Sequence, residues 1–287
     1  MKFVKSVLAL MPVIMFLFFA QTNFTSCQKQ TEVVRDTIIK KDTLVIKDTV
    51  RIIDTVSCYS LTDSLVAYYN FNGGNLNDSS GSNNHIIFNN ATKTADRFGK
   101  PGNAYRFDGA STYMRVLNSP SLNPKKISLV AIVKFNAFYH GPCHANQILK
   151  KGFQDQNDGI YGLRGGVLGI PCNGVVDTSK EQVLGYYGNT QFSSVGAVDT
   201  IDYIKPNTWM IVAFTYDGSE AKLYVDGKLK QTVTSTVPFT PNTFDLLIGK
   251  AEHPQYPYWF NGVIDEIRIY KKALCHGEVH ELSKLKS

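Results

Sequence analysis

The segment at residues 260–274 limits the folds open to this chain more than any other part of the sequence. Read with the two-residue period of a β-strand, one side carries Val263, Asp265, Ile267 and Ile269, and the other carries Ile264, Glu266, Arg268 and Tyr270. The first side is apolar except for Asp265, and we expect the second, with its Glu266/Arg268 pair, to be half solvated. A carboxylate on a core-facing side is costly unless it is hydrogen-bonded, paired with a cation or bound to a metal. Asp265 therefore requires a partner elsewhere in the chain.

Strand patterns recur along most of the chain. Apolar residues alternate with others over residues 65–71 and 127–135, and residues 209–216 form a nearly continuous apolar run, typical of a central strand. Asp-Gly pairs at 217–218 and 226–227 separate further strands, which is a strong hairpin signal. A helical pattern occurs only near the C-terminus. These signals predict an all-β, antiparallel domain with a short C-terminal helix, and its length suits one sandwich without a second domain.

The first residues have the pattern of an export signal. A lysine-containing start precedes an apolar run at about residues 7–20, which is too short to span a bilayer comfortably. The following Phe24-Thr25-Ser26-Cys27 resembles a bacterial lipobox, with Phe where Leu is usual. We therefore interpret residues 1–26 as a lipoprotein signal peptide and Cys27 as the acylated N-terminus. Cleavage after Ala20 by ordinary signal peptidase is the alternative, and the large residue two positions earlier disfavours it.

Residues 27–57 are interpreted as a tether that follows the acylated cysteine. An Asp-Thr pair recurs every six residues, each time followed by mostly β-branched residues: Asp36-Thr37, Asp42-Thr43, Asp48-Thr49 and Asp54-Thr55. The β-branched residues disfavour helix, and a period of two places every Asp on one side of an extended chain. Fully extended, about 30 residues span at most roughly 100 Å. The repeat thus predicts an extended tether, and self-association between the tethers of neighbouring molecules is the alternative.

Charge and cysteine content limit the class of partner. The formal net charge is +6, or about +4 without the two signal-peptide lysines, and no block of basic residues occurs, so nucleic-acid binding has no support. Besides Cys27, an exported chain keeps four cysteines, which allow three pairings: Cys58, Cys143, Cys172 and Cys275. Cys58 and Cys275 bracket the folded region and the other two lie in Gly/Pro-rich loops, so we favour disulfides 58–275 and 143–172. None of the four has the spacing of a zinc site.

Several segments, in a fixed order, resemble a known family. They are residues 65–72, 76–85, 96–109 with Tyr113, the strand that starts at 127, Trp209 with 214–218, 223–228 and the 260–274 motif. Together they are similar to the laminin-G-like, concanavalin A-like jelly-roll family of bacterial exported proteins. The resemblance implies a two-sheet antiparallel jelly-roll sandwich at residues 58–287. Two features depart from the family: Ile86 stands where Gly is frequent, and residues 171–202 exceed a minimal domain, which indicates an elaborated loop.

The resemblance also implies a structural calcium ion, because the family commonly holds one between the first polar loop and the aspartate of the last strand. The matching positions are Asp78, Asn83 and Asp265, with main-chain oxygens near Gly81 and His85 as further ligands. Calcium takes about six to eight oxygen ligands, and carboxylates, amides and carbonyls supply them. In the alternative, Asp265 accepts hydrogen bonds from that loop without a metal, and His85 is a hydrogen-bonding turn residue.

Ligand binding in such folds often uses aromatic rings on rim loops or on the concave sheet face. The loop at residues 253–259 resembles an exposed aromatic platform, and the 171–202 segment contributes further rings. The candidate ligand-binding residues are Tyr256, Tyr258, Trp259, Tyr186 and Tyr187. For each of them, packing in the core is the alternative.

The sequence contains no recognisable catalytic motif. Related laminarinase-type hydrolases carry two glutamates around an aspartate on one strand, and that arrangement is absent; Asp265 and Glu266 are adjacent and so lie on opposite faces. We therefore expect an exported lipoprotein, at the outer membrane or cell surface, that presents a non-catalytic, carbohydrate-binding module. A protein-binding adhesin or envelope assembly component is the alternative, and a cryptic glycoside hydrolase is a second.

Overall fold

The computed structural model describes residues 32–40, 43–51, 60–139, 143–153, 158–167, 176–189 and 194–286. The chain divides into two compact units, Met1–Cys58 and Tyr59–Ser287, and each is described by itself. Within the ranges given above, no helix is both long and apolar enough to cross a membrane.

The first unit contains a β-hairpin built from the six-residue repeat. Strands β1 (Glu32–Lys40) and β2 (Thr43–Arg51) pair antiparallel along their whole length. The extended conformation agrees with the sequence pattern, but the repeat pairs with itself over these residues and does not run as one extended stalk. In the register of this pair, Asp36 lies opposite Lys47.

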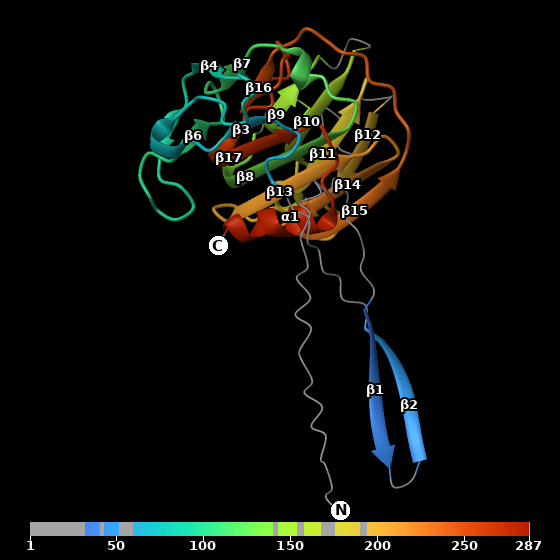
Figure 1. Ribbon diagram of the computed structural model, residues 1–287. Coiled ribbons are helices and arrows are strands. Elements are labelled where there is room, and N and C mark those ends of the chain that lie inside the picture. Colours follow the sequence, from blue (N-terminus) through green and yellow to red (C-terminus); the bar gives the residue numbers. More distant parts are fainter. Residues whose placement is uncertain are drawn as a thin grey trace, which may run out of the picture. The chain divides into compact units, whose positions relative to one another are not determined.

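The second unit is a sandwich of two antiparallel sheets with one helix (Figure 1). The seven-stranded sheet has the order β12 (Ser194–Val198), β11 (Gln182–Gly188), β10 (Ile160–Gly166), β9 (Asn146–Lys151), β16 (Leu246–Ile248), β7 (Met114–Val116) and β4 (Ile86–Asn89). The eight-stranded sheet has the order β15 (Lys228–Thr234), β14 (Glu220–Val225), β13 (Trp209–Tyr216), β8 (Ile127–Ala137), β17 (Asn261–Tyr270), β6 (Ala104–Asp108) and β5 (Thr92–Thr94), and β3 (Leu65–Tyr69) also pairs with β17. The helix is α1 (His276–Ser283), and short 3-10 turns are η1 (Asn72–Gly74), η2 (Pro120–Leu122), η3 (Thr178–Lys180) and η4 (Lys284–Lys286). This architecture confirms the predicted all-β jelly-roll sandwich with a short C-terminal helix.

The segment at residues 171–202 requires a correction, because it is more than an elaborated loop. Two strands of the seven-stranded sheet, β11 and β12, lie within it. Glycines within these strands weakened the strand pattern in the sequence. Gly185 has a packing role: it faces the core, where an added Cβ atom would lie 2.4 Å from the side chain of Phe214.

The central strands β8 and β17 of the eight-stranded sheet are buried on both faces. Their inner face packs against the other sheet in the main core, and α1 packs on their outer face, where Val279 and Leu282 form a second cluster with Tyr270 of β17. The side of β17 that we expected to be half solvated is therefore buried. The predicted pair on that side is present, because Arg268 Nε donates to Glu266 Oε1 at 2.6 Å.

Asp265 lies at a β-bulge in β17. The register with β8 shifts just after Ile264, so Asp265 is the extra residue, and the core-facing positions pass from Ile264 to Ile267. Its Oδ2 accepts hydrogen bonds from the backbone N–H of Arg97 at 3.0 Å and from Arg97 Nη1 at 2.7 Å. The cation that Asp265 requires is thus Arg97, and the predicted contact with the loop at residues 78–85 is not formed by this side chain.

Candidate functional site

A pocket lies on the outer face of the seven-stranded sheet, on the side away from the core. On β10, Tyr161 and Leu163 belong to the core, whereas the alternate residues Ile160 and Arg164 line the pocket. We call it the sheet pocket, and its lining residues are Gln147, Lys150, Ile160, Arg164, Leu184, Gly185, Tyr186, Ser194, Gly196 and Tyr258. Its volume of about 240 Å³ lies just below the usual range for drug-sized ligands, so it suits a small group or a single sugar ring.

Gln147 and Tyr186 meet above Gly162 in the sheet pocket. Tyr186 lies opposite Gly162 in the register of β10 and β11, and its hydroxyl donates to Gln147 Oε1 at 3.3 Å. Gln147 Nε2 in turn donates to the main-chain oxygen of Leu163 at 2.9 Å. An added Cβ atom at Gly162 would lie 2.5 Å from the Tyr186 hydroxyl oxygen, so the absence of a side chain is what allows this arrangement. Burial raises the pKa of Tyr186 well above its usual range, which keeps the hydroxyl neutral.

Tyr258 contributes to the sheet pocket from the loop between β16 and β17. Its backbone has a φ of +49°, an uncommon value for a residue other than glycine. The conformation is held by a main-chain hydrogen bond, in which the N–H of Gln147 donates to the oxygen of Tyr258 at 2.8 Å, and by packing of the ring with Ala145 and Ala251. The folded loop thus fixes the position of the Tyr258 ring at the pocket.

The charges that line the sheet pocket are positive. Lys150 and Arg164 are its charged residues, and its lining contains no Asp or Glu among the residues that the structure describes. The carboxyl group that acts electrostatically on Arg164 is that of Glu181, which is fully buried, bonded to His144 Nε2 and in contact with Asn146 Nδ2 at 3.3 Å. Burial raises the pKa of Glu181 to about 8, against smaller opposing effects of Asn146 and Arg164.

The structure brings together two of the five predicted ligand-binding aromatic residues, Tyr186 and Tyr258, in the sheet pocket. The prediction that Tyr187 binds ligand is wrong, because its side chain points into the core. There its ring stacks on that of Phe239 with 4.6 Å between centroids. Adjacent residues of a strand face opposite sides of the sheet, so Tyr186 and Tyr187 cannot both face the pocket.

The other two predicted aromatic residues lie on separate surfaces. The ring of Tyr256 lies 4.6 Å from that of His253 and 6.3 Å from that of Tyr258, so it extends the aromatic surface that begins at the sheet pocket. Trp259 lies instead near Tyr113, at 6.3 Å between ring centroids, with the Lys250 ammonium 5.1 Å from the Trp259 ring. The predicted single platform is therefore two distinct aromatic groups.

Sequence reasoning missed three polar residues of the sheet pocket, Gln147, Lys150 and Arg164. The sequence does contain a signal for Arg164, which follows Gly162 at the two-residue spacing of an outward-facing strand position. Gln147 and Lys150 have no such signal, because a β-bulge in the pairing of β9 with β10 shifts the alternation between them.

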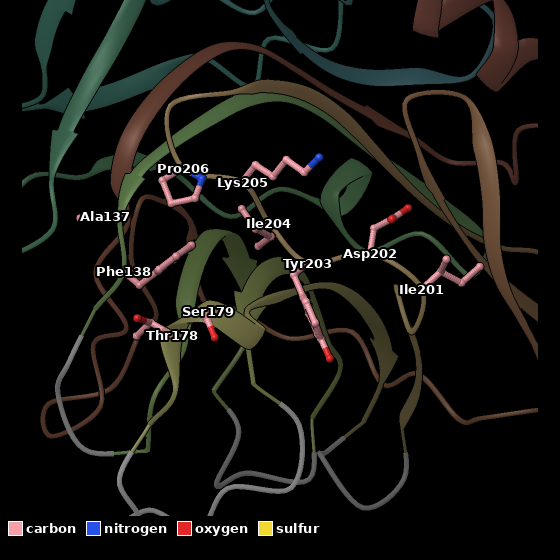
Figure 2. Close-up of a pocket in the computed structure, with 10 residues that line it drawn as sticks. All are labelled: Ala137, Phe138, Thr178, Ser179, Ile201, Asp202, Tyr203, Ile204, Lys205 and Pro206. Atoms are coloured by element: carbon pink, nitrogen blue, oxygen red, sulfur yellow. The ribbon is translucent and has the colours of Figure 1, made fainter.

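A second, wider hollow lies at the rim of the sandwich, and Figure 2 shows its lining side chains. It has a volume of about 770 Å³ and is formed by the end of β8, by η3 and by residues 201–206. We call it the rim hollow. Ile201 and Tyr203 are 68% and 52% exposed there, and the carboxylate of Asp202 is paired with Lys230. Exposed apolar side chains thus dominate this surface.

The residues predicted to hold calcium do not fit that role. Asp78 accepts four hydrogen bonds, from the backbone N–H groups of Tyr68, Ser80 and Asn84 and from the Ser80 hydroxyl, at 2.8–3.0 Å. Asp265 is engaged by Arg97, as described above. No group of three or more His, Cys, Asp or Glu able to hold a metal occurs among the described residues.

The remaining predicted calcium ligands belong to a hydrogen-bonded turn. Asn83 and Gly81 are exposed and have positive φ, and His85 Nδ1 accepts the backbone N–H of Asp78 at 2.9 Å. The buried amide of this loop is that of Asn84, whose Nδ2 donates to the main-chain oxygen of Val66 at 2.6 Å. The loop is thus held to β3 by hydrogen bonds.

Two of the predicted disulfide cysteines can be described. Cys143 and Cys275 are each disulfide-bonded. Cys27, Cys58 and Cys172 lie outside the described residues, so the lipid attachment and the pairing 58–275 and 143–172 stay predictions.

Comparisons with known proteins agree on the fold. A family model, Laminin_G_3, described as the concanavalin A-like lectin/glucanases superfamily, matches residues 108–280. A comparison with curated proteins found no match.

Solved structures of similar fold include binding domains. Domain 4 of AbnA, a GH43 extracellular arabinanase from Geobacillus stearothermophilus solved in complex with arabinotriose, is 20% identical with a TM-score of 0.53, over 77% of this chain and 98% of that domain. The binding domain of Paraclostridial Mosquitocidal Protein 1 is 15% identical with a TM-score of 0.57, over 78% of this chain and 52% of that one. The botulinum neurotoxin serotype D binding domain is 14% identical with a TM-score of 0.54, over 78% of this chain and 52% of that domain. The chain thus spans about half of each toxin domain, and at these identities the likeness concerns the fold.

Proposed function

We propose that this chain, which belongs to the concanavalin A-like lectin/glucanases superfamily, is a non-catalytic module that binds a glycan in the sheet pocket. The observation that carries the proposal is the pairing of Tyr186 and Tyr258 beside Gln147 on the outer sheet face. Aromatic rings offer flat apolar surfaces for sugar rings, and a tyrosine hydroxyl oxygen can accept a hydrogen bond from a sugar hydroxyl.

Two further observations support the proposal. The arabinanase domain of similar fold was solved with arabinotriose, so this fold can hold a glycan in at least that protein. The lining of the sheet pocket contains no carboxylate among the described residues, whereas most glycoside hydrolases require two. A binding role therefore fits this pocket better than hydrolysis does.

A glycan array with the full chain tests the proposal. We expect wild type to bind a subset of glycans, and we expect Tyr186→Ala and Tyr258→Ala each to weaken binding by roughly 10-fold or more, as loss of a buried aromatic contact does. The matched control is Tyr203→Ala, an exposed tyrosine of the rim hollow, which should bind as wild type does. Silence across the array, or loss of binding only in the Tyr203 variant, would exclude the sheet pocket as a glycan site. Release of reducing sugar from any bound polysaccharide would show that the module is an enzyme.

A protein partner is the second candidate, and the rim hollow is the observation that favours it. Its exposed Ile201 and Tyr203 form an apolar surface beside polar residues such as Lys205, as protein interfaces often do. Under this alternative, Tyr203→Ala would abolish capture of an envelope protein and leave any glycan binding intact.

Export and lipid attachment complete the proposal and rest on the sequence pattern alone. We propose that Cys27 is acylated and anchors the chain in the outer membrane or at the cell surface. Cells fed a labelled fatty acid should incorporate it into the wild-type protein, and Cys27→Ser should remove the label and release the chain from the membrane fraction. Retention of the label in that variant would contradict the lipobox interpretation.

A further inference from the structure

Arg164 has an unused hydrogen-bonding group in the sheet pocket. Its Nε is buried and has no hydrogen-bond partner among the described residues. The guanidinium carbon lies 6.0 Å from the centre of the Tyr186 ring. A buried N–H without an acceptor destabilises a fold by about 1–3 kcal/mol, and more for a charged group. An arginine kept in this state fits a role outside the stability of the fold.

Among the described residues, no acidic side chain lines the sheet pocket beside Arg164. On β9, Lys150 adds a second positive charge to the pocket and has a partner of its own. Tyr186 on β11 and Tyr258 in the loop between β16 and β17 contribute phenol groups to the pocket. Glu181 and His144 are bonded to each other, and burial raises the pKa of Glu181. The site therefore presents a net positive charge to whatever enters it.

We propose that the sheet pocket binds an acidic sugar unit, whose carboxylate or sulfate group accepts hydrogen bonds from Arg164. The inference rests on the proposed glycan-binding function and specifies the class of ligand. The planar guanidinium donates in a fork that matches the oxygens of such a group, and Arg164 lies next to the Tyr186 ring, on which a sugar can pack. The pocket volume limits the recognised unit to about one ring.

Titration calorimetry of the full chain with four matched probes tests the inference. The probes are a galacturonic acid trimer, the same trimer with methyl-esterified carboxyls, a sulfated galactose trimer and a neutral galactose trimer. We expect at least one acidic probe to bind tighter than its neutral counterpart by roughly 10- to 100-fold, as expected for a hydrogen bond to a charged group. Which acidic probe binds distinguishes a carboxylate from a sulfate ligand.

Two variants assign that preference to the guanidinium. Arg164→Gln should bind the acidic probe no tighter than the neutral trimer, and Arg164→Lys should retain part of the preference for the acidic probe, because the charge stays while the fork is lost. The melting temperature of Arg164→Gln should equal or exceed that of wild type, since the substitution removes a buried charged donor that lacks a partner. A purely structural arginine would instead give a lower melting temperature.

The outcomes separate this inference from the function on which it rests. If acidic and neutral probes bind equally well, or if Arg164→Gln weakens all of them alike, the acidic-sugar inference is wrong and the glycan-binding function stands. If no probe and no glycan of the array binds, both are wrong.

Discussion

Replacing Arg97 with methionine should lower the free energy of unfolding by about 3 kcal/mol at pH 7, because it leaves a buried carboxylate without its cation. Asp265 has 4% of its side chain exposed, and its Oδ2 receives both the backbone N–H and the guanidinium of Arg97. Arg97 Nε also donates to the main-chain oxygen of Leu285, so the same side chain holds η4 against the last strand. For a domain of this size the expected fall in melting temperature is roughly 6–12 °C.

Three comparisons isolate the ion pair from the loss of side-chain volume. Arg106→Met, at an exposed position of the neighbouring strand β6, should change stability by less than about 0.5 kcal/mol. The double variant Arg97→Met/Asp265→Asn should recover part of the loss, since no unpaired charge remains. Burial raises the pKa of Asp265 while Arg97 lowers it, so without Arg97 the carboxyl binds a proton more readily, and the deficit of Arg97→Met should shrink as the pH falls.

Calcium gives a further comparison for the same pair. Because the oxygens of Asp78 and Asp265 already accept hydrogen bonds from protein donors, calcium and a chelator should give the same melting temperature in wild type. Stabilisation by calcium that disappears in Asp265→Asn would overturn the assignment of Arg97 as the partner and restore the metal clamp.

The need of Asp265 for a cation could be predicted from the sequence, but the identity of the cation could not. Strand periodicity and the desolvation of a carboxylate sufficed for the first step. Arg97 is 168 positions earlier in the chain, and no local pattern brings it to the bulge of β17. A strict two-residue period cannot reveal the bulge. It therefore wrongly placed Val263 instead of Ile264 beside the core.

The sheet pocket was predictable only in part, for a related reason. Tyr186 and Tyr258 could be named as candidates because aromatic residues in loops and inserted segments are visible in a sequence, and both line the pocket. Which of two adjacent tyrosines faces outward depends on the register of β11, and that strand was hidden by its glycines. Whether Arg164 Nε finds a hydrogen-bond acceptor depends on the groups packed around it, which only the folded arrangement determines.

The stability of the chain should also respond to alkaline pH through Lys151. This lysine is fully buried, and its ammonium donates to Asn242 Oδ1 at 2.6 Å and, at 3.3 Å, to the main-chain oxygen of Asn242 and to Asn123 Oδ1. These acceptors are neutral, so burial lowers the pKa of Lys151 to about 8 from its ordinary 10.5, although Asp245 opposes the change. Between these two values the unfolded chain binds a proton that the folded chain lacks, and stability therefore rises with pH. Once the pH exceeds both values, Lys151 has raised the free energy of unfolding by about 3 kcal/mol.

Denaturant unfolding at several pH values between 7 and 10 measures this contribution, provided that it is taken as a difference between variants, because tyrosines also titrate in that range. Lys151→Met removes the titrating group, so its stability should gain less than that of wild type as the pH rises. Lys125→Met, at an exposed lysine, should follow the wild-type curve. Parallel curves for wild type and Lys151→Met would mean that Lys151 keeps an ordinary pKa in the folded state. In that case the three neutral acceptors would compensate the ammonium for its lost hydration.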